Sequence, residues 1–179
     1  MHRNEHSVEI ERPAAAVFPY LTGGEKLRQW VGGLVESTAL TEGGARFGAR
    51  SREVVEERGQ RSELETEITS YVPNEALQAR ITSKGFETLS TYRLQEDGGR
   101  TRLTSVLESR YTMLLARLLA PIVTRQAQKK LEADLERLEA VMNSIRNGLG
   151  MRKVGDRGGP GQPENPHSNA VFIQVHNTL

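Results

Sequence analysis

The order of apolar and polar positions divides the chain into a run of strands and one long helix. Over residues 7–111, apolar and polar side chains alternate in short stretches separated by glycine-containing turns, which is typical of half-buried β-strands. Over residues 112–147 the apolar residues recur with helical spacing. We therefore expect an α+β fold, in which a curved antiparallel sheet wraps around a long C-terminal helix and encloses a cavity for a small apolar molecule.

The first part of the chain predicts one strand and two short helices. Residues 7–12 alternate, with Val8 and Ile10 on one face. Pro13 suits the first turn of a helix, because its missing N–H would have no partner there. We predict helices over residues 13–21 and 25–31, after which Gly32 and Gly33 return the chain to the sheet.

Three candidate turns, at residues 58–59, 84–85 and 98–99, fix the pairing of the strands that they join. If each is a two-residue turn, the register follows directly. The predicted partners are Arg50–Glu67, Arg52–Glu65, Glu56–Arg61, Ile81–Thr88, Ala79–Ser90, Leu94–Leu103, Tyr92–Ser105, Ser90–Leu107 and Glu87–Arg110. The last two turns independently place the same side chains of their shared strand inward, and a slip of one residue would invert them all.

The C-terminal helix carries an apolar stripe that would cover the sheet. The stripe consists of Leu131, Leu135, Leu138, Met142 and Ile145. Pro121 must kink this helix or restart it. Arg125, Lys129 and Lys130 form a small basic cluster near acidic residues, and we interpret it as a solvated, salt-bridged face.

The predicted inner face of the sheet mixes hydroxyl groups with large apolar side chains. Such a mixture favours a ligand cavity, in which hydroxyls orient an apolar molecule. The alternative is a filled core whose hydroxyls bond one another or ordered water. The residues expected to line the pocket are Phe47, Ser51, Thr66, Ile81, Thr88, Ser90, Tyr92, Ser105, Leu107, Leu115, Leu119 and Ile122.

Two inward residues are weak candidates for catalysis. The register points Glu53 inward, and a carboxylate in an apolar cavity could act as a general acid or base. Its position near the strand end equally fits a solvated or arginine-paired group. Tyr92 could donate a hydrogen bond to a ligand carbonyl, or could simply pack and bond a neighbour. Trp30 could cover the pocket or belong to the core.

Composition narrows the choice of partners. The net charge of +1 favours neither nucleic acid nor an anionic membrane. The chain has no cysteine, its first residues are polar, and its most apolar window is too short to span a bilayer. We expect a cytoplasmic protein without stable membrane insertion. The four histidines lie near the termini without ligand spacing, and no glycine-rich phosphate loop is present, so we expect no metal and no cofactor.

Beyond residue 147 the composition changes to glycine and proline. Such a segment buries too little apolar surface to offset its ordering entropy, which predicts a domain over residues 1–147 and a flexible tail over residues 148–179. Residues 170–175 have a strand-like composition and could add to a sheet edge, bind a partner or remain unstructured.

Several stretches together resemble the helix-grip fold of the START-like, or SRPBCC, superfamily, in particular its polyketide cyclase/dehydrase and lipid-transport members. The resemblance covers residues 5–147. The residues that carry it are Val8 to Phe18, Trp30, Tyr92 to Leu94, Thr101 to Thr104 and the leucine stripe at 131, 135 and 138. The resemblance implies a hydrophobic-ligand pocket between sheet and helix, and no universal catalytic residue.

The sequence favours one function and leaves two alternatives. The first is non-enzymatic binding of a small hydrophobic or amphipathic molecule, such as a lipid, isoprenoid, quinone or polyketide. The second is a cyclase or dehydratase that uses Glu53 or Tyr92 in proton transfer. The third is a protein-interaction module like the heat-shock-ATPase activators of the same superfamily. An internal cavity favours the first two, and an exposed apolar patch favours the third.

Overall fold

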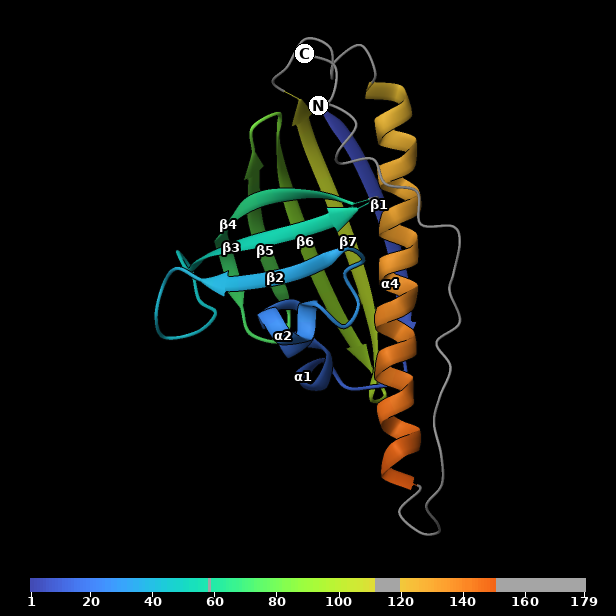
Figure 1. Cartoon of the computed structure of the whole chain (residues 1–179). Helices are drawn as coiled ribbons and strands as arrows, with labels where there is room; N and C mark the ends of the chain where they lie inside the picture. The colour runs from blue at the N-terminus through green and yellow to red at the C-terminus, as the bar shows by residue number, and fades with distance from the viewer. Residues whose placement is uncertain (58, 112–119, 151–179) are drawn as a thin grey trace, which may run out of the picture.

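The structure is a computed structural model that describes residues 1–57, 59–111 and 120–150 (Figure 1). Its elements, in chain order, are β1 (His2–Ile10), α1 (Ala14–Val17), η1 (Phe18–Leu21), α2 (Gly24–Leu27), β2 (Leu34–Ala39), β3 (Arg50–Glu57), β4 (Gln60–Val72), β5 (Ala76–Ser83), β6 (Phe86–Asp97), β7 (Arg100–Tyr111) and α4 (Ala120–Gly150). This is the predicted α+β helix-grip fold. None of the described helices is long and apolar enough to cross a membrane.

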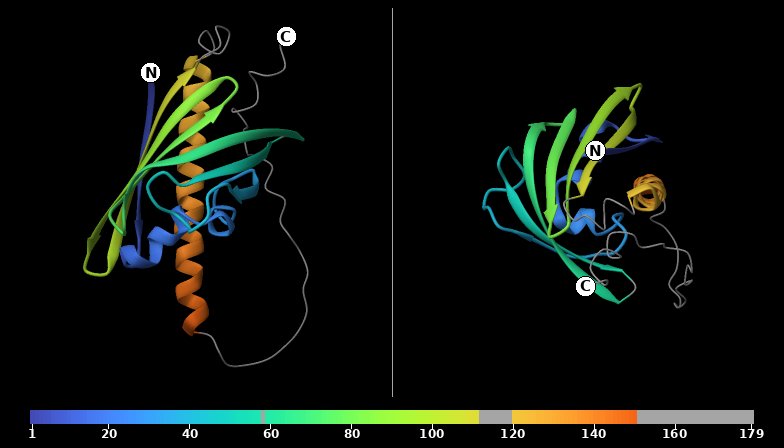
Figure 2. Two further views of the ribbon diagram at one scale, coloured as in Figure 1. Left: turned by 90° about the vertical axis from the view of Figure 1, so that its left-hand side faces the viewer. Right: turned by 90° about the horizontal axis from the view of Figure 1, so that it is seen from above.

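The described strands form one antiparallel sheet in the order β1-β7-β6-β5-β4-β3-β2. The register shifts within β4 between Ile68 and Ser70, and an irregularity of this kind bends a strand and increases its twist. The sheet curves, and α4 lies on its concave side (Figure 2). β1 begins at His2, earlier than the predicted start at residue 7, because the whole strand pairs with β7.

The predicted strand registers are confirmed. Arg50 pairs with Glu67 and Arg52 with Glu65 across β3 and β4. The predicted partners across β5, β6 and β7 are likewise present. Both Gly98 and Gly99 have positive φ angles, 57° and 81°, which suit a tight hairpin turn without steric cost. Arg58 lies outside the described residues.

Phe47 contradicts its predicted inward position, since its side chain is 74% exposed. β3 begins only at Arg50, so Phe47 belongs to the loop after β2 and not to the alternating strand. Gly43, Gly44 and Gly48 in this loop have positive φ angles, which a β-strand does not contain. The prediction had extended the alternation of β3 back through this loop to Phe47.

The short helices close one end of the sheet. α1, η1 and α2 occupy the predicted positions but are shorter than predicted. Pro13 precedes the first helical residue and offers no side-chain cap. Instead, the Glu96 carboxylate at the end of β6 accepts a hydrogen bond from the Ala14 N–H at 2.8 Å. Val17, Phe18 and Leu21 are buried in the core.

α4 covers the concave face as predicted. Leu131, Leu135, Leu138 and Met142 are all buried in one core cluster with residues of the sheet and the short helices. α4 is described from Ala120 onward, with Pro121 as its second residue, and the residues directly before it lie outside the described part of the chain. It continues to Gly150, past the predicted end at residue 147.

Ile122 also contradicts its predicted position. It was expected on the inner wall of the pocket, but its side chain is 57% exposed, whereas its neighbour Val123 is buried. The prediction assigned a broad apolar surface to the start of the helix. Successive residues of a helix point in different directions, and Ile122 points to solvent. Leu115 and Leu119, the other predicted wall residues, lie outside the described part of the chain, as does the predicted tail from residue 151 onward.

Candidate ligand cavity

A partly enclosed cavity of about 150 Å³ lies between α4 and the inner face of β3 to β7. Its walls also include the segment that follows α2. The lining residues are Trp30, Val31, Gly32, Val55, Ser62, Leu64, Ile81, Ser83, Phe86, Thr88, Ser90, Tyr92, Leu107, Ala127, Lys130, Leu131 and Asp134. Most of these contribute carbon atoms, so the cavity is apolar with a few hydroxyls and one pair of charges.

Five of the residues predicted to line a pocket lie in this wall. They are Ile81, Thr88, Ser90, Tyr92 and Leu107. All five come from β5, β6 and β7, where the turns fixed the register. Ser105 is fully buried next to the cavity but outside its lining, directly opposite Tyr92 across β6 and β7.

Ser51 and Thr66 serve a buried carboxylate rather than the cavity. The Ser51 hydroxyl donates to Glu53 Oε1 at 2.6 Å, and the Thr66 hydroxyl donates to Glu53 Oε2 at 2.7 Å. Glu53 is buried, so the register placed it on the correct face. It is not part of the cavity wall, and its two hydrogen bonds are those that a buried carboxylate needs. This geometry removes the reason for considering Glu53 a catalytic group.

The hydroxyls of the inner face differ in whether they have partners. Thr88 Oγ1 and Ser109 Oγ lie 2.9 Å apart and bond each other. Ser90 Oγ and Ser105 Oγ are buried without a hydrogen bond of ordinary geometry, although their residues are only 1% and 0% exposed. Buried hydroxyls without partners are uncommon, because each carries a desolvation cost.

Tyr92 lies between these two serines and is held by Trp30. The two rings meet edge to face, with centroids 6.4 Å apart and planes at 84°. Trp30 is in turn fixed by its indole N–H, which donates to the Tyr20 carbonyl at 2.9 Å. Trp30 therefore belongs both to the core and to the cavity wall.

The phenol of Tyr92 resists ionisation. Desolvation by burial raises the pKa of Tyr92 above its ordinary value of 10.0, and the Asp134 carboxylate adds to this rise. The neighbouring Ser90 and Ser105 hydroxyls act in the opposite direction and lower the pKa, but more weakly than burial raises it. At neutral pH the phenol is therefore a hydrogen-bond donor.

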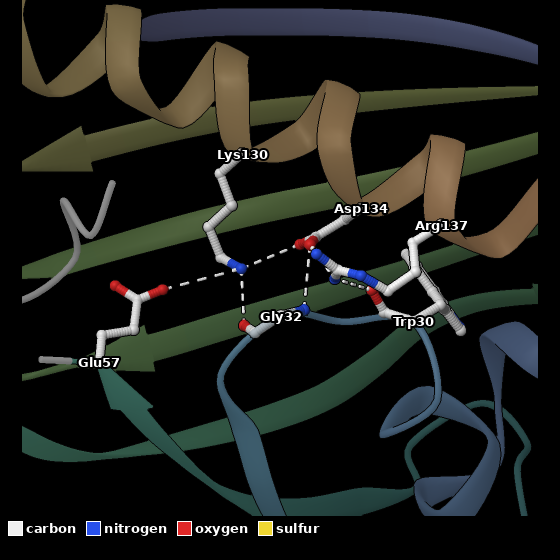
Figure 3. A network of polar contacts seen from close by, with 6 residues as sticks. All are labelled: Trp30, Gly32, Glu57, Lys130, Asp134 and Arg137. Atoms are coloured by element: carbon white, nitrogen blue, oxygen red, sulfur yellow. Dashed lines mark hydrogen bonds and ion pairs between the residues drawn. The ribbon is translucent and has the colours of Figure 1, made fainter. Parts of the chain in front are cut away.

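A set of charged contacts, which we call the latch, fastens α4 to the segment after α2. The latch consists of Lys130, Asp134 and Arg137 of α4 with the backbone of Trp30 and Gly32 (Figure 3). Asp134 Oδ1 accepts the Gly32 N–H at 3.0 Å, and Lys130 Nζ donates to the Gly32 carbonyl at 2.7 Å. Lys130 also bonds Asp134, while Arg137 donates to Asp134 and to the Trp30 carbonyl.

The latch contradicts the predicted solvated face on α4 at two positions. The side chains of Lys130 and Asp134 are only 18% and 11% exposed. Glu57 at the end of β3 lies 3.8 Å from Lys130 and adds a second negative charge. A Cβ atom on Gly32 would come within 3.1 Å of Arg137 Nη1 and Asp134 Oδ1, so glycine lets the backbone approach the charged groups. The sequence of the helix gives no sign that Asp134 binds the backbone of Gly32, which is 102 residues away in the chain.

The charged side chains in the cavity wall are engaged with protein partners. Of the described residues that line the cavity, only Asp134 is acidic, and its carboxylate accepts hydrogen bonds from Gly32, Lys130 and Arg137. Within the described ranges no group of three or more histidine, aspartate or glutamate side chains is placed to hold a metal ion.

Comparison with known proteins identifies the family. The START superfamily protein from Mycobacterium smegmatis has 19% sequence identity and a TM-score of 0.69, and the match covers 81% of this chain and 99% of that one. The Zhui aromatase/cyclase from Streptomyces has 17% identity and a TM-score of 0.69, with 83% and 97% covered. At these identities the likeness shows the fold. No curated protein matches the chain significantly. The family model described as polyketide cyclase / dehydrase and lipid transport matches residues 1–143, and the chain therefore belongs to this family.

Proposed function

We propose that the chain binds a small hydrophobic or amphipathic molecule in the cavity between α4 and the sheet. The observation that carries the proposal is the cavity itself, which is walled by apolar side chains from the sheet, α4 and the segment after α2. Removal of apolar ligand surface from water would supply most of the affinity, at about 25 cal/mol per Å². The family description, which includes lipid transport, supports the same class of ligand.

The cavity volume sets the part of the ligand that fits without rearrangement. A volume of about 150 Å³ is similar to that of engineered protein cavities that admit benzene. A small ring system or a short branched chain fits this space. Because the cavity is only partly enclosed, the rest of a longer ligand would extend beyond it.

A cyclase or dehydratase is the second candidate, and the position of Tyr92 favours it. The phenol lies in the cavity wall and stays protonated at neutral pH, so it could polarise a carbonyl group. Proton abstraction would need a base, and neither Glu53 nor Asp134 is free of hydrogen-bond donors. Binding without chemistry is therefore the simpler function for this wall.

A filled-cavity variant tests the proposal. In Ser90→Trp the indole would occupy the cavity and displace a solvatochromic apolar dye, whereas Arg93→Trp adds the same ring at an exposed position of the same strand. We expect Ser90→Trp to lose dye binding and Arg93→Trp to retain it, with both variants folded by circular dichroism. Unchanged dye binding in folded Ser90→Trp would contradict the proposal. In a separate measurement, native mass spectrometry of the purified full chain would show whether a small molecule co-purifies with it.

A further inference from the structure

The hydroxyl groups of the cavity wall indicate which polar group a ligand could carry. Ser90 lines the cavity and is 1% exposed, and its hydroxyl has no hydrogen bond of ordinary geometry, although it is close enough to the Tyr92 phenol to interact with it. Ser105, opposite Tyr92 on β7, is also buried without such a bond but lies outside the cavity lining. A serine hydroxyl turns between staggered positions about its Cα–Cβ bond at little cost, so the Ser90 hydroxyl can point toward a bound molecule. The missing partner of Ser90 is thus one that a ligand can supply.

The charges around the cavity disfavour an anion as that partner. Lys130, the cation in the wall, already bonds Asp134 and the Gly32 carbonyl and lies 3.8 Å from Glu57. Arg137 is likewise engaged with Asp134 and Trp30. A carboxylate on the ligand would lose its hydration without gaining an uncompensated cation, and it would lie near the Asp134 charge. A neutral oxygen has no such cost.

Tyr92 supplies a second donor next to Ser90. The two residues are on the same face of β6, two positions apart, and both line the cavity. The ring is fixed edge to face against Trp30, so the phenol does not need to be ordered when a ligand binds. A carbonyl oxygen has two lone pairs and can accept from both hydroxyls at once.

Resting on the proposed function, we infer that the ligand carries an uncharged carbonyl oxygen, which enters the cavity first and accepts hydrogen bonds from the hydroxyls of Ser90 and Tyr92. The carbon skeleton then lies against Leu64, Ile81 and Leu131, in the apolar part of the wall. Ketones, aldehydes, quinone-type rings and esters share this oxygen. Free acids, whose carboxylates are charged at neutral pH, are disfavoured.

The test compares three probes that share one ring skeleton: indane, 1-indanone and indane-1-carboxylate. Each is titrated into the full-length protein by isothermal titration calorimetry. We expect 1-indanone to bind about 3- to 10-fold more tightly than indane, which is the range for about one net hydrogen bond, and the carboxylate to bind most weakly. Equal affinity for indanone and indane, or tightest binding of the carboxylate, would overturn the inference.

Two conservative variants and a matched control locate the effect. Ser90→Ala and Tyr92→Phe should each reduce the ratio of indanone affinity to indane affinity, measured within the same variant. Ser7→Ala is the control, because Ser7 lies in β1 outside the cavity lining and its hydroxyl bonds that of Thr104 at 2.8 Å. A preference that survives in both folded variants would also overturn the inference.

The outcomes separate the inference from the proposed function on which it rests. If indane binds, and Ser90→Trp abolishes its binding, but indanone has no advantage, then the cavity binds apolar molecules and the carbonyl assignment is wrong. If none of the three probes binds, both the carbonyl assignment and the binding of ring-sized molecules in this cavity are wrong.

Discussion

Single hydroxyl groups distinguish the two halves of the inner face. On β3 and β4, Ser51 and Thr66 are committed to Glu53, whereas Ser90 and Ser105 on β6 and β7 have no such partner. The alternation of the strands was sufficient to predict that all of them face inward. It could not predict their partners, because these depend on side-chain rotamers and on which strands lie beside each other.

Tyr92 should make stability fall at high pH. Its folded pKa is raised, so the folded state keeps the proton when the unfolded chain has lost it. The stabilisation is complete below the ordinary pKa of 10.0 and is lost as pH rises through the folded value. Urea unfolding between about pH 9 and pH 11 should show a smaller loss of stability in Tyr92→Phe than in the wild type. Parallel curves would mean that Tyr92 is solvated.

Leu135 is a residue at which truncation should strongly destabilise the fold. It is fully buried in the core cluster beneath α4. Leu135→Ala should lower the free energy of unfolding by about 2–5 kcal/mol, through lost burial and the cavity left behind. Glu136→Ala, at an exposed position of the same helix, should change it by less than about 0.5 kcal/mol. Similar values for the two variants in urea titrations would show that the helix presents another face to the sheet.

Among the elements, hairpins were the most predictable and loops the least. A two-residue turn fixes the register of both strands, which is why the pairs around Gly98 and Gly99 came out correctly. Phe47 was misplaced because the prediction extended the strand through Gly48, whose positive φ angle separates Phe47 from β3. The latch was missed because the spacing of Lys130 and Asp134 on one helix suggests an ion pair on its surface, while their other partner, Gly32, comes from a distant segment.

Opening the latch should loosen the segment after α2 without unfolding the sheet. Asp134→Ala removes the acceptor of the Gly32 N–H and leaves Lys130 and Arg137 with one partner fewer. We expect a loss of about 1.5–3 kcal/mol, the range for hydrogen bonds to a charged group. Amide exchange at Gly32 should accelerate, whereas exchange at Leu103 in β7 should not. Asp134→Asn, which keeps a carbonyl acceptor, should have a smaller effect. Unchanged exchange at Gly32 would contradict the role of the latch.

At the scale of the whole molecule, the fold could be predicted because several independent patterns agreed. Alternation, turn positions and the leucine stripe of α4 all favoured one sheet and one covering helix. The cavity could be predicted as a class of site but not in size, since its volume depends on how α4 rests on the sheet. That position is set by long-range contacts, such as the Asn4 amide donating to the Thr124 carbonyl.

The chain beyond α4 should be dispensable for stability. Its glycine and proline content predicts little burial. Deletion of residues 151–179, which leaves α4 intact to Gly150, should lower the thermal midpoint by less than about 5 °C. A larger drop in differential scanning calorimetry would indicate that this part of the chain docks on the domain. Full-length protein at the same concentration is the reference.

The pairing of β1 with β7 has a consequence for biosynthesis. His2 pairs with Ser109 and Ile10 with Thr101, so the first strand translated has no partner until almost the whole sheet has been made. At a synthesis rate of about 5–20 residues per second, β7 is completed roughly 5–20 seconds after β1. The intervening hairpins can form during this time, while β1 remains unpaired. Within β1 only Val8 and Ile10 are apolar, and its other positions are polar or charged. A strand of this composition can remain hydrated on a ribosome-bound chain, which lowers its risk of aggregating before the sheet is completed.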